Sequence, residues 1–325
     1  MLLSYALRRT LWTIPVLLLV VTLLFFMMRS IGGSPLRRGQ LVGISNVAWS
    51  KSADWRPESI ERNMTRKFEL DLPWYRQYLN YLEAVARLDF GNTFSYRYLT
   101  VNSIIARQGK VSLELGLLAF LLAVGVGVPL GVLAALKAGT TADTLARTGT
   151  ALAAATPAFL VGTLLIWLLA VRWGVLPTSG WDSWRAKLLP TVTLALVPAA
   201  WCVRLVRAAL LETLRSDHVR AAAARGLRRS RIVTAHALRN ALVPVVTALG
   251  PILGYLVTGS FVVEAVFSIP GIGRYYVAGV LARDYPLVLG LTVVLTVTIL
   301  LANLVVDVLQ AALDPRLRDA AMPGS

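Results

Sequence analysis

Residues Ser216–Thr247 read SDHVRAAAARGLRRSRIVTAHALRNALVPVVT, a basic and alanine-rich stretch between two apolar segments. Alanine favours helix and Gly226 offers a left-handed stop, so the stretch predicts a short helix that Ser216 can cap. Asp217 in its first turn is favourable near the positive end of the helix dipole. We therefore expect a helix of about three turns inside a polar loop between two membrane spans.

The composition is that of an integral membrane protein. Apolar residues make up 56% of the 325 residues and charged residues only 15%, whereas about a quarter of a soluble domain is charged. The net charge of +16 would suggest nucleic-acid binding in a soluble protein. Arginines placed beside apolar runs explain it better, so no nucleic-acid partner is expected. One cysteine, Cys202, and two histidines predict no disulfide, no metal site and no bound cofactor.

Six uncharged runs have the length, or nearly the length, of a membrane-spanning helix, which needs about 20 residues. They are Leu11–Met28, Leu115–Leu136, Thr148–Val171, Leu188–Val203, Asn240–Val263 and Tyr285–Val306. The fourth run is expected to continue through Arg204 and Arg207, on one helix face, to Leu211. The first resembles a signal peptide, but its length and the lack of a small-x-small cleavage site favour a retained helix. The sequence predicts an all-α polytopic protein with six transmembrane helices.

Lysine and arginine outside the long segment 31–110 predict the orientation. With a cytoplasmic N-terminus, and with Arg29 counted in the long segment, fifteen of these residues fall on the cytoplasmic side and five on the other. We therefore expect both termini in the cytoplasm.

The predicted domains are the tail and first helix (1–30), an extracytoplasmic segment (31–110), a helical core with a cytoplasmic loop at 212–240 (111–315), and a cytoplasmic tail (316–325).

An amphipathic helix is predicted to begin at Pro73 in the extracytoplasmic segment. Its apolar stripe comprises Tyr75, Tyr78, Leu79, Leu82 and Ala86. Two interpretations stay open, namely packing on the membrane surface or on the segment itself, and docking of an external partner.

The chain carries no motif for an energy source of its own. It lacks a G-x-x-x-x-G-K-[ST] phosphate loop, H-E-x-x-H, a nucleophile elbow and C-x-x-C. Acidic residues inside the spans, which ion-coupled carriers usually need, are nearly missing. These absences disfavour an ion-coupled secondary carrier and a membrane enzyme, the two alternatives of other classes. An uphill transporter with this sequence needs a partner that supplies the work.

The basic loop resembles the coupling loop of ABC-importer permeases, whose pattern is E-A-A-x-x-x-G. Arg220-Ala221-Ala222-x-x-x-Gly226 fills this pattern, with arginine in place of glutamate. The sequence is similar in particular to the B-type permease subunits of dipeptide, oligopeptide and nickel importers. The stretches that carry this likeness are Asp217–Leu227, His236–Pro244, Glu264–Arg274, Ala282–Pro286, Asn303–Asp307 and Asp314–Arg318.

The resemblance implies the type I ABC importer permease fold and one half of a translocation pathway in a bacterial or archaeal inner membrane. The implied partners are a second permease subunit in a heterodimer, two cytoplasmic ABC ATPases that bind ATP and Mg, an extracytoplasmic substrate-binding protein, and membrane lipid. The chain itself would be non-catalytic. The implied substrate is a di- or oligopeptide, with nickel chelates and oligosaccharides as alternatives.

The resemblance also implies two contact sites. The ATPase coupling site is assigned to Asp217, Arg220, Ala221, Ala222, Arg225 and Gly226. An external gate or binding-protein contact is assigned to Glu264, Pro270, Gly271, Gly273 and Arg274. A plain connecting turn remains the alternative for this second site, because proline and glycine also suit tight turns.

Overall fold

The computed structural model describes residues 2–30, 71–96 and 99–313, which are nearly all helical. The α-helices are α1 (Leu2–Ser30), α4 (Trp74–Arg87), α5 (Val101–Leu136), α6 (Thr141–Ala155), α7 (Ala158–Leu165), α8 (Trp184–Leu214), α9 (Asp217–Ala224), α10 (Arg229–Arg231), α11 (Leu238–Val266), α12 (Ile272–Ala282) and α13 (Tyr285–Leu313). Two π-helical segments, η1 (Ile166–Arg172) and η2 (Ile232–Ala237), continue α7 and precede α11.

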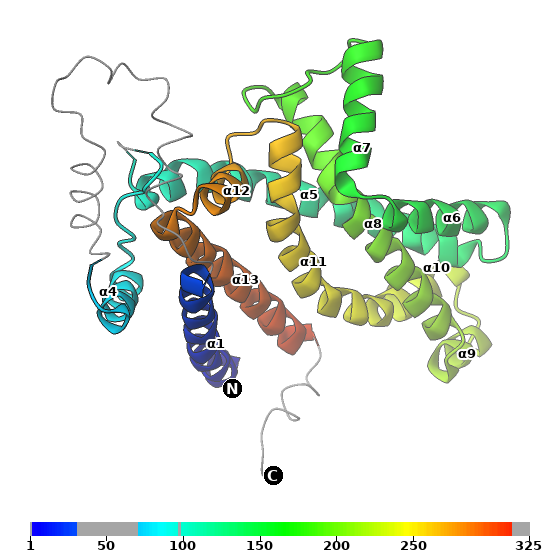
Figure 1. The fold of residues 1–325 in the computed structure, drawn as a ribbon. Coiled ribbons are helices and arrows are strands. Elements are labelled where there is room, and N and C mark those ends of the chain that lie inside the picture. Colours follow the sequence, from blue (N-terminus) through cyan, green and yellow to red (C-terminus); the bar gives the residue numbers. More distant parts are fainter. Residues whose placement is uncertain (1, 31–70, 97–98, 314–325) are drawn as a thin grey trace. The chain divides into compact units, whose positions relative to one another are not determined.

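The chain divides into two compact units. Unit 1 comprises Met1–Thr13, Ser112–Pro270 and Thr298–Ser325, and unit 2 comprises Ile14–Val111 and Gly271–Val297. Unit 1 therefore holds α6 to α11 with most of α5, and it contains the predicted coupling loop (Figure 1).

The predicted all-α polytopic architecture is confirmed. Within the described chain, five helices are long and apolar enough to cross a membrane, and a sixth span results if the bent pair formed by α6 and α7–η1 is one crossing. Helix α8 runs unbroken through Arg204 and Arg207, as expected. Helix α5 begins earlier than its apolar run, at Val101, so the expected domain boundary at 110/111 lies inside this helix.

The third span is not the straight helix that the run Thr148–Val171 predicts. Helices α6 and α7 meet at 105°, with the break at Thr156 and Pro157 (Figure 1). Proline has no amide hydrogen and disfavours helical backbone in the preceding residue. Thr156 accordingly has extended backbone, with φ −94° and ψ 125°. Hydrophobicity alone predicts an unbroken helix, whereas Pro157 indicates the break.

The inward face of α4 includes Tyr78 and Leu82 of the predicted stripe but leaves other residues of the stripe exposed. Tyr75 and Leu79 of the predicted stripe are 49% and 59% exposed. The residues of α4 that pack against buried side chains of unit 2 are Tyr78, Tyr81, Leu82 and Val85. Contacts with α1 fix this rotation, because the Tyr78 ring lies 5.3 Å from that of Phe25 and the Tyr78 hydroxyl bonds to Thr22.

Helices α5 and α8 approach each other closely in unit 1. A Cβ atom at Gly127 would lie 2.6 Å from Cβ of Cys202, and one at Gly131 would lie 2.7 Å from Cβ of Val206. Small residues at such positions allow membrane helices to pack backbone against backbone. On another side α8 packs along α11, where the Trp201 and Tyr255 rings lie 5.4 Å apart. Helix α8 is thus the central element of unit 1.

Candidate functional site

The predicted coupling helix is present as α9, which runs from Asp217 to Ala224. Ser216 occupies the N-cap position, although its hydroxyl donates to the carbonyl of Thr213 instead of capping the helix. Gly226 has φ +78°, the left-handed conformation expected at the end of the helix. Both ends of α9 therefore lie where the sequence places them.

One face of α9 is buried and holds the helix in place. Val219 and Ala222 pack with Ala135 at the end of α5, Leu210 on α8, and three residues of the following segment, Ile232, Ala237 and Ala241. Ala222 is only 8% exposed. Ala222, which the sequence assigns to the ATPase contact, therefore faces the chain's own core and fixes the position of α9.

The opposite face of α9 is exposed and carries small and charged side chains. This face carries four exposed residues, in which Asp217 is three and four residues before Arg220 and Ala221, and Ala224 is four and three residues after them. Arg225 and Gly226 continue the exposed surface beyond the helix. Arg220 lies 3.5 Å from Asp217, but both side chains are in solvent, so the pair adds little stability. The exposed face thus presents a flat alanine surface beside arginine guanidinium groups.

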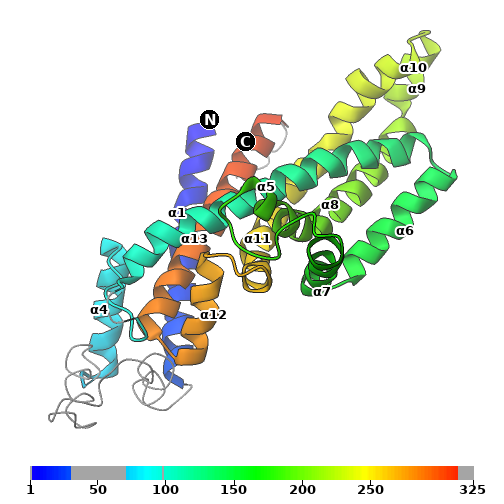
Figure 2. The ribbon, with the colours of Figure 1, turned by 90° about the horizontal axis from the view of Figure 1, so that it is seen from above.

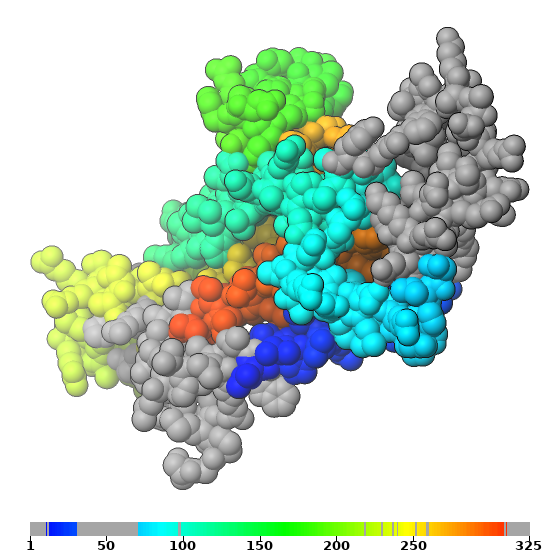
Figure 3. Space-filling model, turned by 90° about the vertical axis from the view of Figure 1, so that its left-hand side faces the viewer, coloured from blue at the N-terminus to red at the C-terminus, as the bar shows by residue number. Residues whose placement is uncertain are grey.

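The segment that follows α9 leads directly into the membrane. The short helix α10 passes into η2, and η2 passes into α11 without a break in the helical path (Figure 2). In the space-filling view, yellow-green atoms of the α9 and α10 segment are visible at the left (Figure 3). Since α8 precedes α9 and α11 follows it, the exposed helix lies between the ends of two spans that pack against each other.

A buried ion pair that sequence reasoning missed lies near this segment. Arg207 on α8 binds Asp143 in the first turn of α6, and the Asp143 side chain is 3% exposed. The sequence predicts Arg207 on one helix face with Arg204 but does not indicate Asp143 as its partner. One signal in the sequence could have indicated Asp143. It is an acidic residue in the first turn of a helix, six residues after the basic loop residue Lys137.

On the other side of unit 1, Glu264 is completely buried. Its carboxylate accepts a hydrogen bond of 2.6 Å from the Ser112 hydroxyl on α5. A neighbouring polar cluster joins the loop before α8 to α5, because Glu114 accepts from the indole of Trp181 and from the ammonium of Lys187. Glu264 therefore lies inside unit 1, whereas Pro270 at the end of this unit is exposed.

The remaining residues of the predicted external site belong to unit 2. Gly271 precedes the first turn of α12, Gly273 is buried within it, and Arg274 is exposed. The external contact predicted for the five residues stays a prediction, and Arg274 and Pro270 are the members that are available at the surface.

Asp284 organises unit 2 at the start of α13. Its buried carboxylate accepts hydrogen bonds from the amides of Ser95 at 2.8 Å and Leu287 at 3.2 Å. It thereby attaches the chain near Ser95 to the first turn of α13. Burial raises the pKa of Asp284 above its usual value of 3.8, and the amide hydrogen bonds lower the pKa by less than burial raises it.

Within residues 2–30, 71–96 and 99–313, no group of three or more histidine, cysteine, aspartate or glutamate side chains could hold a metal ion.

Known proteins show the same sequence pattern and fold. The family described as binding-protein-dependent transport system inner membrane component matches residues 127–319. The oligopeptide transport system permease protein OppB of Haemophilus influenzae is 38% identical over 318 residues, which cover 97% of this chain and 99% of that protein. The dipeptide transport system permease protein DppB of Bacillus subtilis is 37% identical over 302 residues, which cover 93% and 94%.

A solved structure has the same fold. The MetNI methionine ABC transporter in an inward-facing conformation superimposes with a TM-score of 0.55 at 22% identity, over 65% of this chain and 96% of that chain. The prediction of a type I ABC importer permease fold is confirmed.

Proposed function

Because this chain belongs to the family of binding-protein-dependent transport system inner membrane components, we propose that it is the permease subunit of an ATP-driven peptide importer. In this proposal it forms half of a translocation pathway in the inner membrane, with both termini in the cytoplasm. A second permease subunit supplies the other half. The chain itself hydrolyses nothing, since ATP and Mg are bound by two partner ATPases.

The exposed face of α9 is the observation that carries the proposal. An alanine surface allows close approach by a partner groove, and Arg220 and Arg225 can bind acidic or backbone carbonyl groups at its rim. The buried face of the same helix packs on α5, α8 and η2. A partner that binds and displaces α9 would therefore displace several membrane helices together.

The packing suggests how ATP binding moves the pathway. Val219 and Ala222 fix α9 to neighbouring helices, so that a displacement of α9 is passed on as a rigid-body movement of α8 and the start of α11. Closure of the partner ATPases would shift α9, change the angle between these spans and open the pathway toward a substrate-loaded binding protein outside. Pro270 and Arg274 are the proposed contacts for that protein.

The proposal that the substrate is a peptide rests on the relatives. Those with near-complete coverage are named oligopeptide and dipeptide permeases. Nickel chelates and oligosaccharides remain alternatives within the same class of importer. ATP-dependent uptake of a labelled tripeptide into proteoliposomes that contain the whole complex tests this point, and uptake driven by an ion gradient without ATP would contradict it.

Two matched substitutions test docking at α9. Ala221→Trp places a large side chain on the exposed face of α9, and we expect it to abolish peptide-stimulated ATP hydrolysis while the chain still inserts in the membrane. Ala138→Trp places the same side chain at an exposed position in the turn after α5 and should leave stimulation intact. Full stimulation in the Ala221→Trp variant, with normal complex yield, would show that the partner docks elsewhere.

A further inference from the structure

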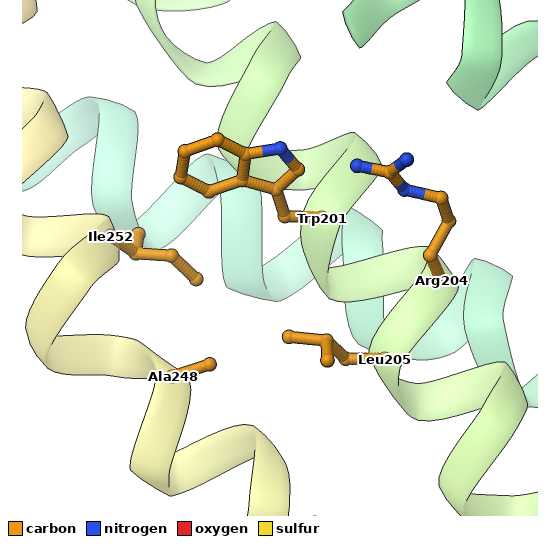
Figure 4. Close-up of a pocket in the computed structure, with 5 residues that line it drawn as sticks. All are labelled: Trp201, Arg204, Leu205, Ala248 and Ile252. Carbon is orange, nitrogen blue, oxygen red and sulfur yellow. The ribbon is translucent and has the colours of Figure 1, made fainter.

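A cavity of ≈ 390 Å³ opens between α8 and α11 within unit 1. Figure 4 shows its five lining residues, which are Trp201, Arg204 and Leu205 from α8 and Ala248 and Ile252 from α11. Its lining is almost wholly apolar, and Arg204 is the single charged residue among the five. A mostly apolar cavity with one placed polar group is the usual form of a small-ligand site.

Arg204 differs from its neighbour Arg207 in its charged partners. Arg207 is paired with Asp143, whereas Arg204 takes part in none of the ion pairs found among the described residues. Arg204 lies ten residues before the end of α8, inside a helix that can span the membrane. An ionisable side chain inside a span is costly and marks a functional site by default, with a partner of opposite charge to be named.

The direction of the Arg204 side chain narrows the choice of partner. Figure 4 shows the guanidinium group at the level of Trp201, on the side toward the start of α8. It thus points away from the α9 end of α8, as helical side chains generally lean toward the N-terminus of their helix. The positive charge of Arg204 is suited to an anion that enters the cavity.

The walls of the cavity belong to the two helices that α9 joins. Helix α8 ends two residues before α9 starts, and α11 follows it through η2. If a movement of α9 shifts α8 against α11, the distance between Trp201 and Ile252 changes, and with it the size of the cavity. A site with this property can hold a ligand in one state and release it in another.

We propose that this cavity is a transient binding site for the free C-terminal carboxylate of a transported peptide, with Arg204 as the carboxylate ligand. The inference rests on the proposed peptide transport and adds a site to it. The planar guanidinium group can bind both oxygens of a carboxylate. Trp201, Leu205 and Ile252 provide the apolar surface for the side chain of the last peptide residue.

Photocrosslinking during turnover tests the site. The complete transporter in lipid nanodiscs, with its binding protein and ATP, is irradiated with a tripeptide whose C-terminal residue is photoleucine with a free carboxylate. We expect adducts on the cavity residues, mapped by mass spectrometry. Arg204→Gln should lower their yield about tenfold, as loss of a charge-assisted hydrogen bond predicts, and Arg204→Lys should keep most of it. Arg215→Gln, an exposed arginine at the end of α8, is the matched control.

The outcomes separate this inference from the proposed function. Adducts on the binding protein should be equal in all variants, which shows that delivery is intact. If the unaltered complex takes up the tripeptide with ATP but forms no adducts in the cavity, or if Arg204→Gln leaves their yield unchanged, the site is wrong and peptide transport stands. Loss of the second permease or of bound anionic lipid from the Arg204→Gln complex, without loss of adducts, would assign Arg204 to that partner instead. A lack of ATP-dependent uptake would overturn both proposals.

Discussion

Arg207 on α8 donates two hydrogen bonds to the carboxylate of Asp143 on α6, with Nε to Oδ1 at 2.6 Å and Nη2 to Oδ2 at 2.9 Å. Asp143 also accepts from the amide of Gly139, which closes the turn between α5 and α6. Because Arg207 lies seven residues before the end of α8, this pair attaches the start of α6 to the part of α8 that leads into α9.

Neutralising one member of this pair should destabilise the protein more than neutralising both. Asp143→Asn leaves the partly buried Arg207 without its counter-charge, and we expect the melting temperature of the purified complex to fall by about 5 °C. Arg207→Gln in addition removes the uncompensated charge and should recover at least half of the loss. The measurement is thermal unfolding in detergent, and a double variant that is less stable than either single one would contradict the assignment.

Adding one methyl group at Gly127 or Gly131 should force α5 and α8 apart. Each new Cβ atom would lie within 3 Å of α8 backbone or side-chain atoms, and such overpacking costs about 1–3 kcal/mol. The single cysteine, Cys202, lies buried at this contact, so the variants should react faster with a membrane-permeant maleimide. Gly125→Ala is the control, because no neighbouring atom lies within 4 Å of its Cβ position. Equal labelling rates in all three variants would disprove close packing here.

Gly226 should be replaceable by asparagine but not by alanine. Its φ of +78° costs a residue with an ordinary side chain about 1 kcal/mol, and asparagine tolerates this region better. No atom lies within 4 Å of a Cβ at this position, so the backbone cost is the only one. We expect Gly226→Ala to weaken peptide-stimulated ATP hydrolysis several-fold at unchanged expression and Gly226→Asn to retain most of it. Equal activity of the two variants would show that the left-handed turn is not needed.

Asp284 should make stability depend on pH. Because its folded pKa is raised above the ordinary value of 3.8, the folded state binds the proton more tightly than the unfolded state. Its contribution to stability is therefore fully present below pH 3.8 and is lost as the pH rises through the folded pKa. Asp284→Asn lacks this loss, so its melting temperature relative to the unaltered protein should increase between pH 4 and pH 7. A constant difference across that range would refute the proposed linkage.

Much of the fold follows from local signals in the sequence. The apolar runs predict the spans because a helix in lipid satisfies its own backbone and exposes only side chains. The ends of α9 can be predicted from Asp217 in its first turn and from Gly226 after its last turn, because each residue influences only the backbone a few residues away. The continuation of α8 through Arg204 and Arg207 is also local, since arginine favours the helical backbone.

Other features depend on contacts that no local pattern contains. Asp143 and Arg207 are 64 residues apart, and their pairing requires the observed packing of α6 on α8. The rotation of α4 depends on the rings of α1, so the sequence of α4 alone does not indicate that Tyr78 and Leu82 pack inward while Tyr75 and Leu79 are exposed. The burial of Ala222 could not be predicted for the same reason, because only contacts with the neighbouring helices distinguish the four alanines of α9.

The bend between α6 and α7 has a consequence for biosynthesis. The apolar run 148–171 is long enough to enter the membrane as one straight helix. The 105° bend that it has in the structure needs packing against other helices. The packing that stabilises the angle comes from residues synthesised afterwards, since Gly162 on α7 lies against Thr193 and Phe267. We therefore expect the bend to form only after α8 and α11 have left the ribosome, so that this crossing matures last among its neighbours.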